Sequence, residues 1–203
     1  MDGTLVDSRA AVERSWREWA APRGLDADAL IRLAHGRRSR ETLAEVLPPS
    51  QVEAATAELD AAELVNNEGV VAIPGALELI ESLSPDSWAV VTSAGPELAE
   101  IRLRAAGIPA VPVLVTSEDV IRGKPDPEGY HFAAQRLGVE ASACVVFEDA
   151  PPGISAGLAA GARVVALSTT QPLARLAGAT VIIQDLRMVR AARTGAGWQL
   201  TIG

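Results

Sequence analysis

The chain has 203 residues, of which 48% are hydrophobic and 22% charged, so it can form a packed core and is not expected to be disordered. No apolar run approaches the roughly 20 residues that span a bilayer, which argues against a membrane protein. A net charge of −8 and only 3% aromatic residues argue against nucleic-acid binding, because that function needs clustered Lys and Arg and often stacking rings.

Residues 8–67 have the pattern of short helices rather than of strands. Four apolar residues recur at the spacing of one helix face, and the helix that they predict stops near Pro22. They are Val12, Trp16, Trp19 and Ala20. Three more helices are predicted from capping residues and helix breakers. One runs from Asp26 to Gly36, one from Ser39 to Pro48 and one from Ser50 to Asn66. We therefore expect a small helical module in this part of the chain.

From Pro74 onward, short apolar runs alternate with helical stretches. Each run is rich in β-branched residues, as in the strands of a parallel sheet that is buried on both faces. The predicted strands cover 88–93, 111–115, 144–147, 163–167 and 180–183. This alternation predicts an α/β fold, in which functional residues gather at the carboxyl ends of the strands.

Polar residues follow two of the predicted strands. Thr92 and Ser93 end one strand and supply hydroxyls that could donate to a phosphate group. Glu148 and Asp149 end another, and adjacent carboxylates at a strand end form a hard-oxygen site suited to Mg²⁺. The pattern thus favours a phosphate and metal site at the carboxyl ends of the strands.

Two further groups of residues are candidates for chemistry. Asp2 and Gly3 form an acidic tight turn near the start of the chain. Lys124 precedes a proline and a predicted helix start at Asp126–Pro127, a position well suited to neutralise an anion. Taken singly, each group has an ordinary structural explanation: a turn, a helix cap or exposed charge. Their occurrence in this order, each at a strand end or in a loop, favours a functional site.

Other reactive residue types form no catalytic or metal-binding pattern. His35 and His131 lack the spacing of a metal-ligand pair, and no Ser-His-Asp or Cys-His set is evident. The single cysteine, Cys144, cannot form an internal disulfide and is expected in the core, within a strand. A lone cysteine also fits a reducing compartment, so we expect a cytoplasmic protein.

Four segments of the chain resemble the ordered motifs of the haloacid dehalogenase superfamily. They are Asp2-Gly-Thr-Leu-Val-Asp, Val-Val-Thr92-Ser, Gly-Lys124-Pro-Asp-Pro and Val-Phe-Glu148-Asp149-Ala-Pro-Pro-Gly. The likeness covers essentially the whole chain and is closest to the sugar-phosphate and polyol-phosphate phosphatases, which include the glycerol-3-phosphate and 2-deoxyglucose-6-phosphate phosphatases. It implies a Rossmann-like parallel-sheet core of three αβα layers, residues 1–7 and 74–203, with an inserted helical cap domain, residues 8–73.

The same resemblance implies Mg²⁺-dependent hydrolysis of a small sugar or polyol phosphate. Asp2 would be the general acid and then the general base, while Thr92 and Lys124 would hold the phosphoryl oxygens. Asp149, aided by Glu148 and the Asp2 carbonyl, would bind Mg²⁺. The residues expected to bind the rest of the substrate are Ser93, His35, Gly36, Arg37 and Arg40. The expected partner is a small phosphorylated metabolite, and the expected assembly is a monomer or weak homodimer.

The first motif departs from that of the family in one respect. In the family it reads Asp-x-Asp-Gly-Thr, and its first Asp attacks phosphorus to form an aspartyl-phosphate. Asp2 aligns with the second Asp, so the attacking residue and the apolar strand that carries it would precede Met1. We expect a sheet without that strand to have two unpaired inner edges, and the 203-residue chain to be inactive in hydrolysis. Either upstream residues belong to the protein, or the chain descends from a phosphatase and only binds its ligand.

Three other functions can be compared on the residues. Phosphoglucomutase relatives carry a cap-hinge histidine where this chain has Val12, which disfavours a hexose phosphomutase. Dehalogenases lack an acid at the position of Asp2, whose presence favours phosphate chemistry. A catalytically dead, phosphatase-like protein that binds a phosphorylated ligand stays open. A coding sequence upstream of Met1 that reads as an apolar strand ending in Asp would favour the enzyme.

Overall fold

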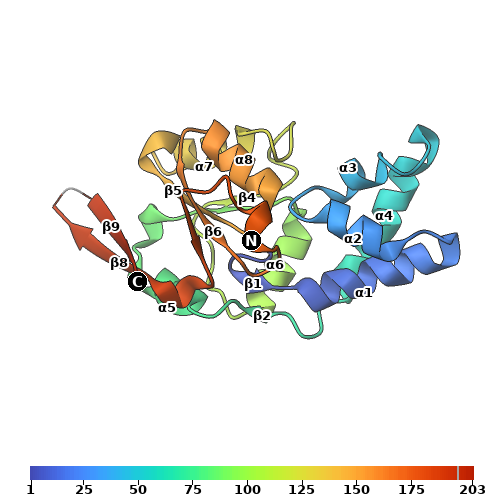
Figure 1. Ribbon diagram of the computed structural model, residues 1–203, viewed down its shortest axis with the longest axis horizontal. Coiled ribbons are helices and arrows are strands. Elements are labelled where there is room, and N and C mark those ends of the chain that lie inside the picture. Colours follow the sequence, from blue (N-terminus) through green and yellow to red (C-terminus); the bar gives the residue numbers. More distant parts are fainter. Residues whose placement is uncertain (196) are drawn as a thin grey trace.

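The β-rich runs of the sequence form the parallel strands of the core. A computed structural model describes residues 1–195 and 197–203 and shows their arrangement (Figure 1). β3 (Val90–Val91) pairs with β4 (Leu114–Val115), while β5 (Val145–Glu148), β6 (Arg163–Leu167) and β7 (Val181–Ile183) pair in that order. All of these pairings are parallel, which confirms the predicted α/β fold.

Helices cover both faces of these strands, which gives the core three layers (Figure 1). α7 (Glu128–Arg136) and α8 (Pro151–Ala159) contact the strands from one side. α5 (Ala76–Ser82) and α6 (Pro96–Ala105) lie on the other side, where their apolar residues share a cluster with buried residues of β3, β6 and β7. Burial of this apolar surface is the main favourable contribution to folding of the core.

The parallel strands form two ladders rather than one continuous sheet. Among the described residues, β3 pairs only with β4 and β5 pairs only with β6, so each has one edge without a ladder partner. Backbone N–H and C=O groups on such an edge need a neighbouring strand or water to satisfy them. The free edges of β3 and β5 are therefore places where a further strand or water can pair.

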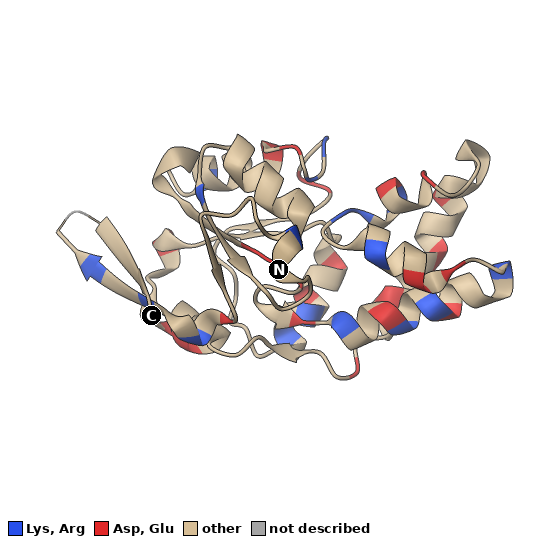
Figure 2. Cartoon of the chain, in the orientation of Figure 1, with Lys and Arg blue, Asp and Glu red and all other residues tan. Residues whose placement is uncertain are grey.

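A second group of helices lies beside the core and is called the helical module here. It consists of α1 (Arg9–Ala20), α2 (Ala27–Ala34), α3 (Ser39–Leu43) and α4 (Pro49–Val65), which share an apolar cluster of their own around the buried Trp16. Acidic and basic side chains both occur on α1, α2 and α3, whereas the charged side chains of α4 are all acidic (Figure 2). In the described part of the chain, no helix has both the length and the apolar character needed to cross a membrane.

Two short strands join the helical module to the core. β1 (Val6–Asp7) leads into α1, and β2 (Val71–Ala72) follows α4. They pair antiparallel, with Val6 opposite Ala72, so the chain leaves and re-enters the core at adjacent points. An inserted domain is joined in this way, although the boundaries expected at residues 8 and 73 stay predictions.

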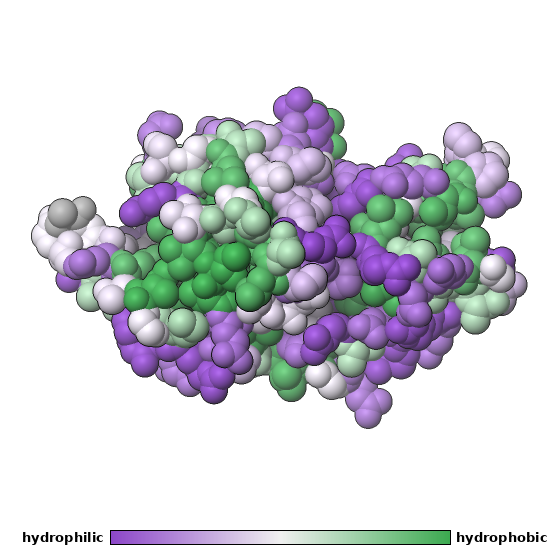
Figure 3. All heavy atoms as spheres, in the orientation of Figure 1, coloured by the Kyte–Doolittle hydropathy of each residue, from purple (hydrophilic) through white to green (hydrophobic). Residues whose placement is uncertain are grey.

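A C-terminal hairpin is a feature that the sequence analysis missed. β8 (Val189–Thr194) and β9 (Gly197–Ile202) pair antiparallel and project from the core beside α5 (Figure 1). The buried Val189 and the partly buried Leu200 attach one face of the hairpin to the main apolar cluster. On the face drawn in Figure 3, apolar side chains gather on the core between this hairpin and the helical module.

Several local predictions about element ends need correction. Ser39 and Ser50 are not N-caps, because Arg38 and Pro48 hold those positions; Ser39 is the first residue of α3, and Ser50 lies inside α4. Proline is favoured in the first helical turn, which explains why α4 begins before Ser50. Cys144 precedes β5 instead of lying within it and is only partly buried, so it is not a core residue.

Two other predicted helix starts are close to the observed ones. Asp26 caps α2 as predicted, and its Oδ1 accepts a hydrogen bond from the Ala29 N–H at 3.0 Å. α7 begins at Glu128, one residue later than predicted, with Pro127 at the N-cap. The Asp126 carboxylate still accepts a hydrogen bond from the Glu128 N–H at 3.0 Å, so it satisfies a free donor of the first turn.

Candidate active site

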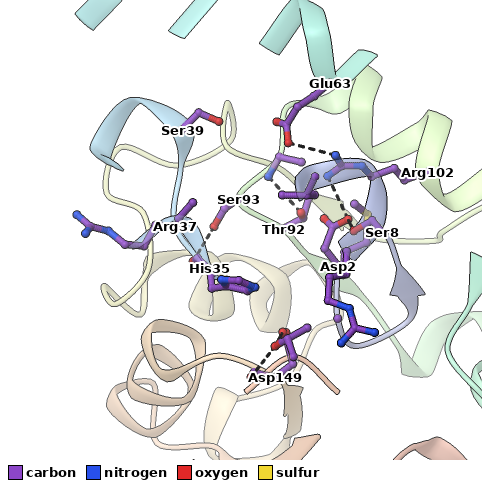
Figure 4. A pocket seen from close by; sticks show the side chains of 18 of the residues that line it. Asp2, Ser8, His35, Arg37, Ser39, Glu63, Thr92, Ser93, Arg102 and Asp149 are labelled. Carbon is purple, nitrogen blue, oxygen red and sulfur yellow. Dashed lines mark hydrogen bonds and ion pairs between the residues drawn. The ribbon is translucent and has the colours of Figure 1, made fainter. Parts of the chain in front are cut away.

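A pocket lies where β3 and β5 end, between the core and the helical module. Figure 4 shows Asp2, Thr92 and Asp149 on the core side of this pocket, with the His35 ring reaching toward it from the module. The predicted site residues that line it are Asp2, His35, Gly36, Arg37, Thr92, Ser93, Lys124, Glu148 and Asp149. The structure therefore brings residues from all four motifs together.

Asp2 is held by a tight turn and by two donors. Gly3 follows it with φ of 72°, a backbone conformation that favours glycine. Oδ1 of Asp2 accepts hydrogen bonds from Ser8 Oγ at 2.5 Å and from Arg102 Nη1 at 3.1 Å. Burial opposes ionisation, but the charges of Arg102 and of the amino terminus, together with the Ser8 hydrogen bond, outweigh it and lower the pKa of Asp2. Asp2 is therefore a carboxylate with a fixed orientation.

The two hydroxyl residues after β3 have different partners. Thr92 is buried, and its Oγ1 accepts a hydrogen bond from the Ala94 N–H at 3.1 Å. Ser93 Oγ donates to the Gly36 carbonyl at 3.2 Å, which links the core to the helical module across the pocket. A hydroxyl group can donate one hydrogen bond, so Thr92 can still donate to an oxygen in the pocket.

Glu148 is the counter-ion of Lys124. Its Oε1 forms an ion pair with Lys124 Nζ and accepts a hydrogen bond from the Tyr130 hydroxyl at 2.6 Å, while its Oε2 accepts one from the Asp149 N–H at 3.2 Å. Burial opposes ionisation of Glu148, but the Lys124 charge outweighs it and lowers the pKa of Glu148. Burial and the adjacent Glu148 charge raise the pKa of Tyr130, so its hydroxyl keeps its proton as a donor.

Asp149 lies against the turn that carries Asp2. A Cβ atom built on Gly3 would fall 2.1 Å from Asp149 Oδ2, so only glycine fits beside this carboxylate. Thr4 Oγ1 donates to Asp149 Oδ1 at 3.3 Å, and the Thr170 hydroxyl donates to Oδ2 at 2.5 Å. Burial and the neighbouring Glu148 charge nevertheless raise the pKa of Asp149 to about 6. Its negative charge is thus incompletely compensated by the residues around it.

This incomplete compensation is the feature that fits a divalent cation. Two adjacent carboxylates with hard oxygen atoms are ligands that Mg²⁺ accepts, and the ion usually keeps several of its waters. No group of three or more His, Cys, Asp or Glu residues gathers for a metal within the described ranges. Asp149, with Glu148 beside it, would therefore hold the ion together with backbone carbonyls and water.

The residues expected from the helical module are not all at the pocket. His35 lines it, and its Nδ1 donates to the Ile31 carbonyl at 2.6 Å, which holds the ring in place. Arg37 also lines it, but its guanidinium points away in Figure 4 and pairs with Glu45 at 2.6 Å. Arg40 does not line the pocket; it pairs with Glu53 on the exposed surface.

Several side chains at the pocket or beside it were not found from the sequence, among them Ser8 and Thr170, which donate to Asp2 and Asp149. Arg102 and Glu63 line the pocket, and Tyr130 touches Glu148 from α7. Arg102 lies in an otherwise ordinary amphipathic stretch, and only a contact with residues 100 positions away reveals it. Tyr130 lies one helical turn after Asp126–Pro127. Its closeness in sequence to Lys124 is the signal that could have placed it near the Lys124–Glu148 pair.

Comparison with known proteins decides the family. A sequence profile of the haloacid dehalogenase-like hydrolases matches residues 1–161, which include the pocket residues Asp2, Thr92, Lys124 and Asp149. The chain belongs to the haloacid dehalogenase-like hydrolases. The family predicted from the four motifs is therefore confirmed, and the parallel strands and flanking helices agree with the α/β, Rossmann-like core that it implied.

Two relatives of the chain are named as phosphatases of a hexitol and of a sugar phosphate. The chain is 37% identical to Hexitol phosphatase A of Escherichia coli (strain K12) over 97% of its own length and 94% of that protein. It is 35% identical to 2-deoxyglucose-6-phosphate phosphatase 2 of Saccharomyces cerevisiae, over 93% and 87% of the two chains. A hydrolase structure from Pseudomonas syringae matches with a TM-score of 0.81 at 29% identity, over 92% of this chain and 91% of that one.

Proposed function

We propose that the protein hydrolyses a small sugar or polyol phosphate monoester in a Mg²⁺-dependent reaction. The observation that carries this proposal is the convergence of Asp2, Thr92, Lys124 and Asp149 on one pocket beneath the helical module. Phosphate transfer needs cationic and hydroxyl donors for the phosphoryl oxygens, a metal site and a group that moves a proton, and these residues supply all of them. The sugar-phosphate and hexitol phosphatase relatives support the substrate class.

Lys124 and Thr92 would bind the phosphoryl group. The Lys124 side chain is 10% exposed, and its Nζ has Glu148 and the Val91 carbonyl as partners at the pocket. An ammonium group has three donors, and Thr92 keeps its hydroxyl hydrogen, so both can donate to a phosphoryl oxygen. In a pocket of low dielectric, such fixed donors stabilise the charge that develops in the transition state.

Asp2 would move the proton of the reaction. A carboxyl in this position would give its proton to the leaving alcohol oxygen and would later take one from the attacking water. The Ser8 and Arg102 donors hold Asp2 as a carboxylate in the free protein, which suits the second of these roles. Bound Mg²⁺ at Asp149 and Glu148 would supply charge neutralisation for phosphate.

The attacking carboxylate that the resemblance implies would directly precede Met1. The Met1 nitrogen is buried at the pocket, where burial and the nearby Lys124 charge lower the pKa of its amino group. A residue joined to this nitrogen would therefore emerge beside Lys124, Glu148 and Asp149. That position favours formation of an aspartyl-phosphate by a preceding Asp.

The helical module would act as a cap that covers the substrate and excludes bulk water. We also propose that the protein works in the cytoplasm, as a monomer or weak homodimer, on a small phosphorylated metabolite. Its single cysteine, Cys144, supports a reducing compartment. Among the candidate substrate residues, His35 and Gly36 are better placed than Arg37 and Arg40, which pair with glutamates of the module.

Hydrolysis by three chains tests this function. One is the 203-residue chain, one carries an added apolar strand that ends in Asp directly before Met1, and one carries the same strand ending in Asn. We expect Mg²⁺-dependent release of phosphate from a hexitol phosphate only with the Asp extension, and a higher melting temperature with both extensions because the sheet regains a strand. Turnover by the unextended chain at rates typical of enzymes would contradict the assigned roles.

A phosphorylated-ligand binding protein is the second candidate function. It is favoured by one observation: Thr92 and Lys124, which would hold phosphate, line the pocket, and binding alone needs no attacking carboxylate. Such a protein would bind the hexitol phosphate with an affinity that does not change when the Asp extension is added. It would also release no phosphate in any of the three chains.

A further inference from the structure

Arg102 is a buried cation that joins the proposed acid and base to the helical module. It lies in α6 of the core and is only 3% exposed. Its Nη1 is 3.1 Å from Asp2 Oδ1, and its Nη2 is 3.3 Å from Glu63 Oε1. Because Glu63 lies in α4 of the module, one guanidinium contacts both parts of the molecule, as the dashed lines in Figure 4 show.

These two carboxylates are what hold the guanidinium in place. The third nitrogen, Nε of Arg102, has no hydrogen-bond partner in the part of the chain that the structure describes. A buried cation needs opposite charges close by, because the loss of its hydration is not otherwise offset. Removal of one carboxylate should therefore free half of the guanidinium and change the geometry of its remaining ion pair.

The contacts of Asp2 make it sensitive to such a shift. Both of its hydrogen bonds, from Ser8 and from Arg102, go to Oδ1. The two residues that orient this side chain thus act on the same oxygen atom. A movement of Arg102 would consequently turn or release the carboxylate that lines the pocket.

Apart from Ser8 at the N-cap of α1, the other contacts named here between the module and the core lie elsewhere. Ser93 meets the Gly36 carbonyl, and Arg38 donates to the carbonyls of Val120 and Ile121 at 2.9 and 3.3 Å. None of these contacts touches Asp2. Through Arg102, the position of α4 is thus linked to the orientation of this pocket carboxylate.

We propose that Arg102 is a positioning residue that orients Asp2 only while Glu63 anchors its second nitrogen. Seating of the helical module against α6 would then set the proton-transfer group in place, and displacement of the module would release it. The value of this link for catalysis rests on the proposed function of Asp2, but the link itself is a property of the three side chains. It can be measured in the 203-residue chain without turnover.

The test follows the carboxyl ¹³C signal of Asp2 by NMR at constant neutral pH, assigned by its loss in Asp2→Asn. Glu63→Gln removes one anchor without touching Asp2, and Glu53→Gln makes the same change in the same helix on the exposed surface. We expect Glu63→Gln to shift or broaden the Asp2 signal and Glu53→Gln to leave it unchanged. Amide exchange in the turn at residues 3–6 should speed up by roughly tenfold in Glu63→Gln, because one charge-assisted contact is lost.

A second background separates transmission through Arg102 from a direct effect. In the Arg102→Met background, Glu63→Gln should no longer change the Asp2 signal. If Arg102→Met does not fold, Arg102→Lys gives the same comparison, because its single ammonium holds one carboxylate at a time. An unchanged Asp2 signal in Glu63→Gln, or an equal change with and without Arg102, would overturn the proposal. Neither result depends on hydrolysis, so failure of the link is distinguishable from failure of the proposed function.

Discussion

Gly153 lies so close to Glu148 that a Cβ atom on Gly153 would fall 2.0 Å from the Glu148 carboxyl carbon. The first turn of α8 therefore approaches the counter-ion of Lys124 as closely as the backbone allows. This approach explains why Glu148 can be buried while its oxygens still reach Lys124, Tyr130 and the Asp149 N–H.

Gly153→Ala should displace the Glu148 carboxylate and weaken phosphate binding. The added methyl group leaves no room for the present position of Glu148, so Lys124 loses its fixed orientation. We expect a loss of stability of about 1–3 kcal/mol, as for other overpacked sites, and an affinity for inorganic phosphate that is lower by about tenfold. Thermal unfolding and calorimetry measure the two effects. Gly178→Ala is the matched control, because its Cβ would meet only ordinary contacts of 3.5 Å and beyond.

Mg²⁺ should depend more on Asp149 than on Glu148. Glu148 is engaged by Lys124 and Tyr130, whereas the Asp149 charge is incompletely compensated. Asp149→Asn should therefore weaken Mg²⁺ binding by about tenfold or more, and Glu148→Gln by less. Isothermal titration of both variants measures this difference. Equal affinities in the two variants would remove Asp149 from the primary role.

The pH dependence of stability should report on Asp149. Its pKa of about 6 in the folded chain lies above its ordinary value of 3.8, so the folded state binds this proton more tightly than the unfolded state does. The contribution of Asp149 to stability is therefore largest at low pH and is lost as the pH rises through about 6. Without metal, Asp149→Asn should gain stability relative to the unmodified chain between about pH 4 and about pH 7.5, by at most about 3 kcal/mol.

Denaturant unfolding in the presence of a chelator measures that difference, and added Mg²⁺ supplies the control. Bound metal should remove the advantage of Asp149→Asn at neutral pH, because it compensates the ionised carboxylate. A stability difference between Asp149→Asn and the unmodified chain that is the same at about pH 4 and about pH 7.5 would show that Asp149 ionises normally.

Tyr130→Phe should disturb the Lys124–Glu148 pair with little loss of packing. The substitution removes only the hydroxyl that donates to Glu148 at 2.6 Å. Because a buried carboxylate oxygen then loses a donor, we expect a stability loss of about 1–3 kcal/mol and a measurably lower phosphate affinity. Phe132→Leu in the same helix is a control for packing alone, since Phe132 contacts Arg136 rather than the pocket. Phosphate affinity that falls equally in both variants would argue against a role for the hydroxyl.

The core and the motif residues were predictable because their signals are local. Runs such as 163–167 carry consecutive β-branched residues, and the polar residues that end β3 and β5 follow those runs directly. In a parallel sheet, strand ends converge on one edge, so Thr92 and Asp149 could be placed together from the sequence. The hairpin of β8 and β9 was missed although glycines separate two alternating runs there.

The parts of the site that could not be predicted depend on contacts between distant residues. Arg102 meets Asp2 and Glu63 across 100 and 39 positions, and no short pattern encodes such a meeting. The arginines in α3 and just before it show the opposite error, because they were predicted to bind the substrate. Arg37 and Arg40 form a positive cluster in the sequence, but each pairs with a glutamate of the module once the helices pack.

The most direct test of the phosphate site is calorimetric binding of a hexitol phosphate to the 203-residue chain in the presence of Mg²⁺. The unphosphorylated hexitol and the Lys124→Met variant are the comparisons. We expect the phosphate ester to bind at least about tenfold more tightly than the hexitol, and the advantage to disappear in Lys124→Met, because the phosphoryl group is held by charge-assisted contacts. Equal affinities for ester and hexitol, or an ester affinity that survives the loss of Lys124, would contradict the assignment of this pocket to phosphate monoesters.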